Sequence, residues 1–474
     1  MIMQSLAFRF KSVQLFGVLL SAVIIGFSAC KKDDPPVAAN QIQFEANKVG
    51  FSGDESTLEV HLELSRAAAA AGVLELQVNG HGVTYAEQYT TSPEVENGKI
   101  QLPFEQGAQE VAFTLKKTEG VTLDGDESIE FIVTSVGSGF VLGPTDSLSV
   151  VFSAIVSEGS TMKINGGAGG SAAENVVFVD LSGNKQTAVK RMNWDLGFFN
   201  GDDFRVILNN TLPEAMAVAI DKTDLTKVSA SDTAGIVLTS TYTSGDLAKV
   251  DDFSGDLSKT VIRSISADEA ANKVYILNRG EAAAHTDGKR DWMKIRIIQK
   301  DGGYQLQYAK ISDATFKTVD IAKEQAHHFS YVSLDEGKKV AVMPEKNKWD
   351  FQWGVGSYFT GSGGSNIYYP FSDLVFINHR DGVEAAEVLT SSVKYDAIDA
   401  EDLNSLTFSG ERDAIGANWR ATTGKSIGVF TDRFYVIKDP AGNYYKLRFN
   451  NFTSEDGGTR GYPNIEYALI KAAK

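Results

Sequence analysis

Few side chains in this chain of 474 residues could carry out covalent chemistry. The chain has six histidines and one cysteine. It contains neither the Gly-x-Ser-x-Gly turn of a serine hydrolase nor the His-Glu-x-x-His pair of a zinc protease. No pair of acidic residues is marked out by its surroundings as the two carboxylates of a glycoside hydrolase. Without a visible nucleophile and base, we expect a binding protein and not an enzyme.

The single cysteine has a different expected role. Arg9 and Lys11 precede an apolar run that ends in small residues at Cys30, which is the order of regions in a secretory signal peptide. The residues before Cys30 resemble a bacterial lipobox, with Phe27 where leucine is more usual. The sequence therefore predicts a signal peptide over residues 1–29 and acylation of Cys30. A charged, proline-containing tether over residues 30–40 resembles the surface-export signals of known lipoproteins, so we expect an anchor in the outer membrane that faces the cell exterior.

The charge balance argues against nucleic acid as a partner. The full chain has a net charge of −16, and removal of the signal peptide with Arg9 and Lys11 makes it −18. Such an acidic surface repels phosphate backbones, and no stretch gathers lysines and arginines with interleaved aromatic residues. Because no cysteine is left for disulfide bonds, each domain must be held by its own apolar core, for which 43% hydrophobic residues suffice.

Residues 41–155 alternate apolar and polar side chains in short runs, as in Leu58–Leu64 and Ser128–Val133. Period-two runs separated by Gly, Asp and Ser predict an antiparallel β-sandwich. The acidic turn that opens Asp124–Phe131 resembles that of the Calx-β family. Some members bind calcium there, so the resemblance makes three acids candidate calcium ligands: Asp124, Asp126 and Glu127. The alternative is that these acids are solvated and that the domain is a spacer.

The rest of the chain contains the same unit twice. Four pairs of segments recur in order: Asn175–Leu196 and Phe329–Phe351, Phe204–Asn210 and Leu374–His379, Lys273–Leu277 and Arg433–Ile437, and Tyr304–Ile311 and Asn464–Ile470. This order predicts duplication of an all-β module of about 150 residues. We place the first copy at residues 156–318 and the second at residues 319–474. Trp194 and Trp349, which recur in a Trp-Asp pair, are expected in the cores.

The second copy carries a specific series of motifs. Trp349-Asp350 is followed by a turn at Asn378, by Tyr435-Val-Ile-Lys-Asp439 and by Arg460-Gly-Tyr-Pro463. This series resembles the HmuY-like family of haem-binding lipoproteins over most of residues 320–474, and more faintly over residues 160–315. The resemblance implies a surface-exposed lipoprotein that captures haem or a related tetrapyrrole and passes it to a TonB-dependent receptor of the outer membrane.

The resemblance also directs attention to two loops that supply haem-iron ligands in the family. The loop after the Asn turn offers His379 in the second copy and Met216 in the first. The loop before the Tyr-Val-Ile strand offers no histidine or methionine, either in residues 397–432 or in residues 225–272. The sequence therefore leaves open an alternative function, in which the haem ligands are lost and the module binds a surface glycan or a partner protein.

An aromatic-rich segment, Phe351–Phe371, surrounds the glycine-rich residues Gly361–Ser365. We expect a long loop that could close over a flat ligand, because aromatic faces stack on porphyrins and on sugars. The candidate haem contacts in it are Trp353, Tyr358, Tyr368 and Tyr369. The alternative is that some of these rings pack inward as core residues.

Overall fold

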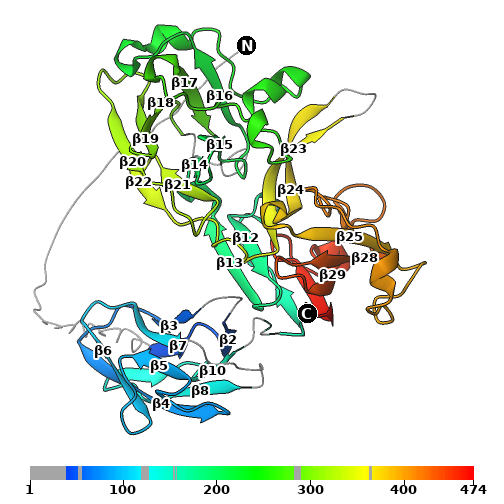
Figure 1. The fold of residues 1–474 in the computed structure, drawn as a ribbon. Helices are drawn as coiled ribbons and strands as arrows, with labels where there is room; N and C mark the ends of the chain where they lie inside the picture. Colours follow the sequence, from blue (N-terminus) through cyan, green and yellow to red (C-terminus); the bar gives the residue numbers. More distant parts are fainter. Residues whose placement is uncertain are drawn as a thin grey trace, which may run out of the picture.

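The computed structural model describes residues 39–51, 56–118, 127–152, 155, 157–281, 290–361 and 366–473. Within these ranges the regular elements are β-strands and short 3-10 helices, which confirms the predicted all-β class. Figure 1 shows a separate N-terminal domain, in blue and cyan, and a larger body that contains the duplicated sequence.

The N-terminal domain is a sandwich of two five-stranded sheets, in the strand orders β5-β7-β3-β1-β9 and β2-β10-β8-β4-β6. Alternate residues point into its core as the period-two pattern predicts, so that Val60, Leu62 and Leu64 of β3 are all buried. Neighbouring strands pair antiparallel except at two edges, where β1 pairs with β9 and β2 with β10 in parallel. The strands are β1 (Asn40–Phe44), β2 (Lys48–Gly50), β3 (Thr57–Leu64), β4 (Gly72–His81), β5 (Tyr89–Ser92), β6 (Lys99–Phe104), β7 (Glu110–Lys117), β8 (Ser128–Ser135), β9 (Phe140–Leu142) and β10 (Ser147–Val151).

The body has two lobes, each with a core between two sheets. In the first lobe a sheet of order β16-β17-β18-β19-β20 packs on a sheet of order β15-β14-β21-β22. Its strands are β14 (Leu196–Phe199), β15 (Val206–Leu208), β16 (Ala215–Ile220), β17 (Val274–Arg279), β18 (Met293–Lys300), β19 (Gly303–Lys310), β20 (Lys317–Ile321), β21 (Phe329–Ser333) and β22 (Lys338–Val340).

The second lobe repeats this arrangement. A sheet of order β11-β30-β29-β28-β25 packs on a sheet of order β13-β12-β23-β24. Its strands are β11 (Gly159–Lys163), β12 (Asn175–Asp180), β13 (Lys185–Lys190), β23 (Phe351–Thr360), β24 (Ile367–Ile377), β25 (Glu384–Leu389), β28 (Arg433–Lys438), β29 (Tyr444–Asn451) and β30 (Asn464–Lys471), and β26 (Arg420–Ala421) with β27 (Gly428–Val429) forms a small ribbon.

The matching strand orders support the duplication, but the two copies exchange hairpins. The hairpin β12–β13 of the first copy pairs with β23 of the second, and the hairpin β21–β22 of the second copy pairs with β14 of the first. Figure 1 shows β12 and β13 beside β23 and β24 in the second lobe. The boundary predicted between residues 318 and 319 falls inside β20, and the packing divides the chain elsewhere.

The Trp-Asp pair of each copy fastens the hairpin of the other. Asp350 accepts a hydrogen bond of 2.7 Å from the backbone N–H of Leu181 at the turn of β12–β13. Asp195 accepts the equivalent bond of 2.7 Å from Leu334 at the turn of β21–β22. Because both carboxylates are buried, each of these bonds is expected to stabilise the exchanged arrangement by more than a solvent-exposed bond would.

The connections between strands contain short 3-10 helices, of which η8 places side chains at the junction of the lobes. These are η1 (Gly170–Ala172), η2 (Arg191–Asn193), η3 (Leu225–Lys227), η4 (Ala230–Thr233), η5 (Ser244–Lys249), η6 (Leu257–Lys259), η7 (Glu269–Ala271), η8 (His379–Asp381), η9 (Asp402–Ser405) and η10 (Ser454–Asp456).

Candidate functional site

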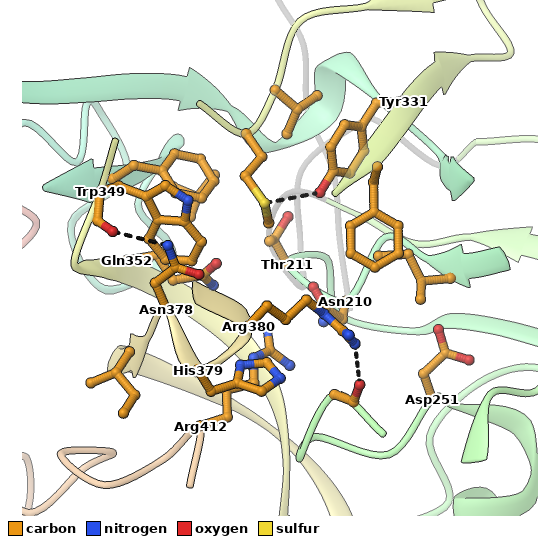
Figure 2. A pocket seen from close by; sticks show the side chains of 18 of the residues that line it. Asn210, Thr211, Asp251, Tyr331, Trp349, Gln352, Asn378, His379, Arg380 and Arg412 are labelled. Atoms are coloured by element: carbon orange, nitrogen blue, oxygen red, sulfur yellow. Dashed lines mark hydrogen bonds between the residues drawn. The ribbon is translucent and has the colours of Figure 1, made fainter. Parts of the chain in front are cut away.

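A cavity lies where the two exchanged hairpins meet, and both copies contribute to its wall (Figure 2). The first copy supplies β12, Trp194 and the loop around residues 251–260, and the second copy supplies β21, Trp349 and η8. Its position between equivalent elements of the duplicated fold makes it the natural candidate for a ligand site.

Aromatic rings form the apolar wall in two equivalent pairs. Trp349 meets Phe178 edge to face with ring centroids 5.1 Å apart, and Trp194 meets Tyr331 with centroids 4.8 Å apart. The Tyr331 hydroxyl lies 3.9 Å from the sulfur of Met343, which also lines the cavity. Figure 2 shows this tyrosine directed at the sulfur atom. The predicted burial of both tryptophans is thereby confirmed, but they border a cavity at the junction of the lobes.

Three buried polar atoms of the lining have no hydrogen-bond partner among the residues that the structure describes. They are the indole Nε1 atoms of Trp194 and Trp349 and the side-chain oxygen Oδ1 of Asn378. Asn378 uses its Nδ2 group to donate 3.0 Å to the carbonyl of Trp349, an interaction that is visible in Figure 2. Since buried polar groups are usually paired, these atoms indicate that the cavity accommodates polar as well as apolar groups.

Two arginines and a histidine lie on one side of the cavity, opposite the acids Asp251, Asp252 and Asp256. His379 and Arg380 belong to η8, and Arg412 approaches from the loop after η9. Burial, together with the positive charges of Arg412 and Arg380, lowers the pKa of His379 to about 3. The imidazole is therefore neutral near pH 7 and keeps a lone pair for a metal ion.

The loop that faces η8 approaches it very closely at Gly255. The backbone there has a φ of +78°, and a Cβ atom would lie 3.0 Å from the His379 ring. The carbonyl of Gly255 also accepts a hydrogen bond from Arg380. A glycine is required by both the backbone conformation and the space, so this contact fixes the position of η8 against the first lobe.

Carboxylates in the same loop are engaged by the protein itself. Asp251 accepts 2.7 Å from the backbone N–H of Leu208 and 2.8 Å from that of Val261. Burial raises the pKa of Asp251 to about 6 in spite of these bonds. This carboxyl group thus braces the loop against β15 and is close to half ionised at mildly acidic pH.

The cavity is narrow as it stands. The space within it that a water-sized sphere can occupy is about 60 Å³. Sites for drug-sized ligands enclose roughly 300–1,000 Å³. Entry of a large ligand therefore requires the lining segments to move apart.

Of the candidate haem contacts named from the sequence, His379 lines this cavity, whereas Met216, Trp353, Tyr358, Tyr368 and Tyr369 do not. Met216 and Tyr368 are both fully buried in one apolar cluster of the first lobe, and Trp353 is fully buried in the core of the second lobe. Tyr368 accepts 3.0 Å from the backbone N–H of Glu214, and burial raises its pKa to about 12. The proposed roles of these residues in haem contact stay predictions.

The aromatic-rich segment folds as the long hairpin β23–β24, where a closing loop was expected; its residues 362–365 lie outside the described ranges. Tyr358 donates 2.6 Å to Asp413, and its ring centroid lies 4.4 Å from that of Phe253. Tyr369 is 43% exposed and lies beside Tyr242, with centroids 6.1 Å apart. The hairpin is therefore largely held against the first lobe, with one aromatic residue pair at the surface.

The other predicted sites are only partly covered. Cys30, Asp124 and Asp126 lie outside the described residues, and Glu127 directly precedes β8. Among the described residues, no group of three or more His, Cys, Asp or Glu side chains is arranged to hold a metal ion. Within the same ranges, no helix has the length and apolar character needed to cross a bilayer.

Sequence reasoning missed Met343, Arg380 and Arg412 as residues of the site. Met343 lies between the β21–β22 hairpin and Trp349, the interval that holds Met192 in the first copy. A search of this interval for iron donors would have found it, but the family resemblance directed the search to other loops.

The chain was compared with curated proteins, with solved structures and with models of protein families. No curated protein matches the chain. A crystal structure of the apo form of the Calx CBD1 domain is 15% identical, covers 24% of this chain and 96% of its own, and has a TM-score of 0.21. A putative carbohydrate binding protein from Bacteroides ovatus is 10% identical, covers 91% of this chain and 98% of its own, and has a TM-score of 0.16. Neither similarity is close enough to support an inference about function.

The family model described as HmuY protein matches residues 172–467, which include every segment that lines the cavity and both lobes except β11 and the end of β30. This match covers more than half of the chain as one continuous unit. The chain belongs to the HmuY protein family.

Proposed function

We propose that this chain binds haem, or a related tetrapyrrole, in the cavity at the junction of the lobes and carries it as cargo for uptake. The observation that supports this function best is that two iron-donor side chains, His379 and Met343, line one aromatic-walled cavity. A neutral imidazole and a thioether are both axial ligands that haem iron accepts. Membership of the HmuY family is the second support.

The wall chemistry also fits a porphyrin. The rings of Trp194, Trp349, Phe178 and Tyr331 offer flat apolar surfaces, on which a conjugated macrocycle can stack. The space available to a water-sized sphere, about 60 Å³, is too small for the whole ring. We therefore propose that the structure represents the closed form and that loading separates η8 from the loop at residues 251–260.

The cellular setting follows from the same family and from the sequence. We propose that acylated Cys30 anchors the protein to the outer membrane facing the cell exterior, with the N-terminal sandwich as a spacer. The bound tetrapyrrole would then pass to a TonB-dependent receptor. Binding of calcium by Asp124, Asp126 and Glu127 remains a separate prediction for the N-terminal domain.

Haemin titration followed by absorbance tests the binding function. We expect the wild-type chain to shift and sharpen the Soret band at one equivalent, and we expect His379→Ala and Met343→Leu to alter the band position and weaken binding at least tenfold. His81→Ala, at an exposed histidine of the N-terminal domain, is the matched control. An unchanged Soret band with the wild-type chain would reject haem binding, and an unchanged response in both variants would reject this cavity.

A surface glycan- or protein-binding function is the second candidate, and one observation favours it. Tyr242 is 56% exposed and Tyr369 43% exposed, and the two rings lie side by side where they could stack on a sugar. Retention on a glycan array that is lost in Tyr369→Ala, combined with no haem spectrum, would support this candidate.

A further inference from the structure

The cavity is asymmetric although the fold around it is duplicated. Asn209 and Asn378 are equivalent, because each donates its Nδ2 group to the carbonyl of the tryptophan in its own copy, at 2.8 and 3.0 Å. In the second copy the next residues are His379 and Arg380, whereas in the first copy they are Asn210 and Thr211. One end of the cavity therefore carries a histidine and an arginine where the equivalent end carries uncharged side chains.

The two arginines at the end with His379 make contacts that leave much of their donor capacity unused. Arg380 donates to the carbonyl of Gly255, and its guanidinium lies 5.7 Å from the ring centroid of Phe199. Arg412 donates 2.8 Å to the carbonyl of Phe253, and its guanidinium lies 4.1 Å from the ring centroid of Phe376. Each guanidinium group carries five N–H donors, so most of them remain available.

The described residues place no carboxylate within ion-pairing distance of either guanidinium group. The acids nearby are bound to other groups: Asp251 to two backbone N–H groups, Asp252 to the N–H of Ser254, Asp256 to Lys259, Asp381 to His328, and Asp413 to Tyr358. Burial and mutual repulsion lower the pKa of Arg412 to about 10. Asp251 and Asp413 attract Arg412, and Asp256 and Asp381 attract Arg380, but none of these carboxylates forms a direct ion pair with either arginine. Both guanidinium groups therefore keep N–H donors for the oxygen atoms of an incoming anion.

The two tryptophans add further donors to the same cavity. Trp194 is 3% exposed and Trp349 is 5% exposed, and neither indole N–H has a partner among the described residues. Among the described residues of the lining, the one buried acceptor atom without a hydrogen-bond partner is Oδ1 of Asn378. The balance of unpaired groups favours a ligand that brings acceptor oxygens.

We infer that the corner formed by Arg380 and Arg412 binds the carboxylate groups of a flat, anionic ligand and thereby orients it with its carboxylate edge toward η8. This inference rests on the proposed function, and it narrows the ligand to a porphyrin with free acid side chains. The planar guanidinium group suits carboxylates because it can donate two parallel hydrogen bonds. An esterified porphyrin lacks the negative charge and leaves both arginines unpaired.

The test compares iron protoporphyrin with its dimethyl ester, both in detergent with the full chain. We expect the wild-type chain to bind the free acid at least tenfold more tightly than the ester. Arg380→Leu combined with Arg412→Leu should abolish this preference, whereas Arg380→Lys with Arg412→Lys should retain part of it. Arg263→Leu, at an exposed arginine outside the cavity lining, is the matched control.

The outcomes separate this inference from the proposed function. Equal binding of acid and ester by the wild-type chain overturns the carboxylate corner and leaves haem binding intact. Binding of neither compound overturns the proposed function. If the double leucine variant does not fold, as judged by circular dichroism, the acid-to-ester ratio of the wild-type chain and of Arg380→Gln decides the question.

Discussion

Asp439 of the second copy occupies the position that Arg279 holds in the first copy. The burial pattern establishes the equivalence, because Tyr275 and Leu277 enter the first lobe's core as Tyr435 and Ile437 enter the second lobe's core. Two residues further along each strand, the first copy has a guanidinium and the second a carboxylate.

This difference between Arg279 and Asp439 gives the aspartates of the two Trp-Asp pairs opposite electrostatic surroundings. Asp195 is paired with Arg279 at 2.8 Å and also with Arg290. Its counterpart Asp350 has the acids Asp180 and Asp439 nearby, and burial followed by their negative charges raises the pKa of Asp350 well above its ordinary value. Asp195 thus belongs to a network of ion pairs, whereas Asp350 is surrounded by other acids.

The first prediction concerns pH. Because the folded state raises the pKa of Asp350, folding favours its protonated form, and stability contributed by this group is lost as pH rises above the unfolded value of about 4. Asp350→Asn keeps an acceptor for the N–H of Leu181 and removes the charge. We expect its melting temperature to exceed that of the wild-type chain at pH 8 and the difference to shrink at pH 4.5.

The matched substitution in the other copy should have the opposite sign. Asp195→Asn leaves Arg279 and Arg290 without their buried counter-ion, which typically costs about 3–5 kcal/mol. Thermal unfolding at pH 8 measures both variants. A lower melting temperature for both would show that the acids around Asp350 do not oppose folding.

The second prediction concerns the exchanged hairpins. Fragments 156–322 and 323–474, cut after β20, each lack a hairpin that their main sheets require, since β14 pairs with β21 and β12 with β23. We expect neither fragment to unfold cooperatively alone, and we expect the co-expressed pair to elute as a 1:1 complex with the circular dichroism spectrum of the intact body. A cooperative melt of an isolated fragment would contradict the exchange.

A third prediction distinguishes the two methionines. Met216 is fully enclosed in an apolar cluster outside the cavity lining, so Met216→Ala should lower the unfolding free energy by about 2–5 kcal/mol. In contrast to the haem contact predicted from the sequence, we expect its haem affinity to be unchanged at temperatures where the protein is folded. Met343→Ala should do the reverse, with a small change in stability and weaker haem binding. Denaturant unfolding and haemin titration on the same samples measure the two effects.

A fourth prediction follows from the environment of His379. Its pKa of about 3 means that the imidazole is unprotonated across the mildly acidic range, whereas an ordinary surface histidine gains a proton near pH 6.5. Because the free chain does not have to release a proton from this imidazole before it binds iron, we expect the affinity for haemin, followed by the Soret band, to be unchanged between pH 8 and pH 5. A loss of the band with a midpoint near pH 6.5 would show that the iron donor is a solvent-exposed histidine.

The sequence predicted the β-class and the duplication because the alternation of side chains and the recurring segments are local properties. It did not predict the exchange of hairpins, since the alternation in β12 or β21 is the same whichever strand lies beside it. Phe351–Phe371 was expected to be a loop because its glycines outweighed its alternation, and tertiary contacts such as that of Tyr358 with Phe253 stabilise it as a hairpin.

The candidate site was predicted in part. His379 was found from its place after the Asn turn, and the structure brings it to the cavity. Arg412 lies 33 residues further along the sequence and contacts Phe253 of the first copy. No pattern within either segment indicates that contact, because it arises only when the two lobes are packed together.

The chain passes between the lobes at two places only within the described body, Arg191–Asp195 and Ala341–Asp350. Each crossing carries a Trp-Asp pair, and both tryptophans border the cavity. These two segments are therefore the covalent links about which the lobes could rotate, and the proposed tetrapyrrole would lie between them. A receptor that bound both lobes and changed the angle between them could release the proposed tetrapyrrole without contacting it.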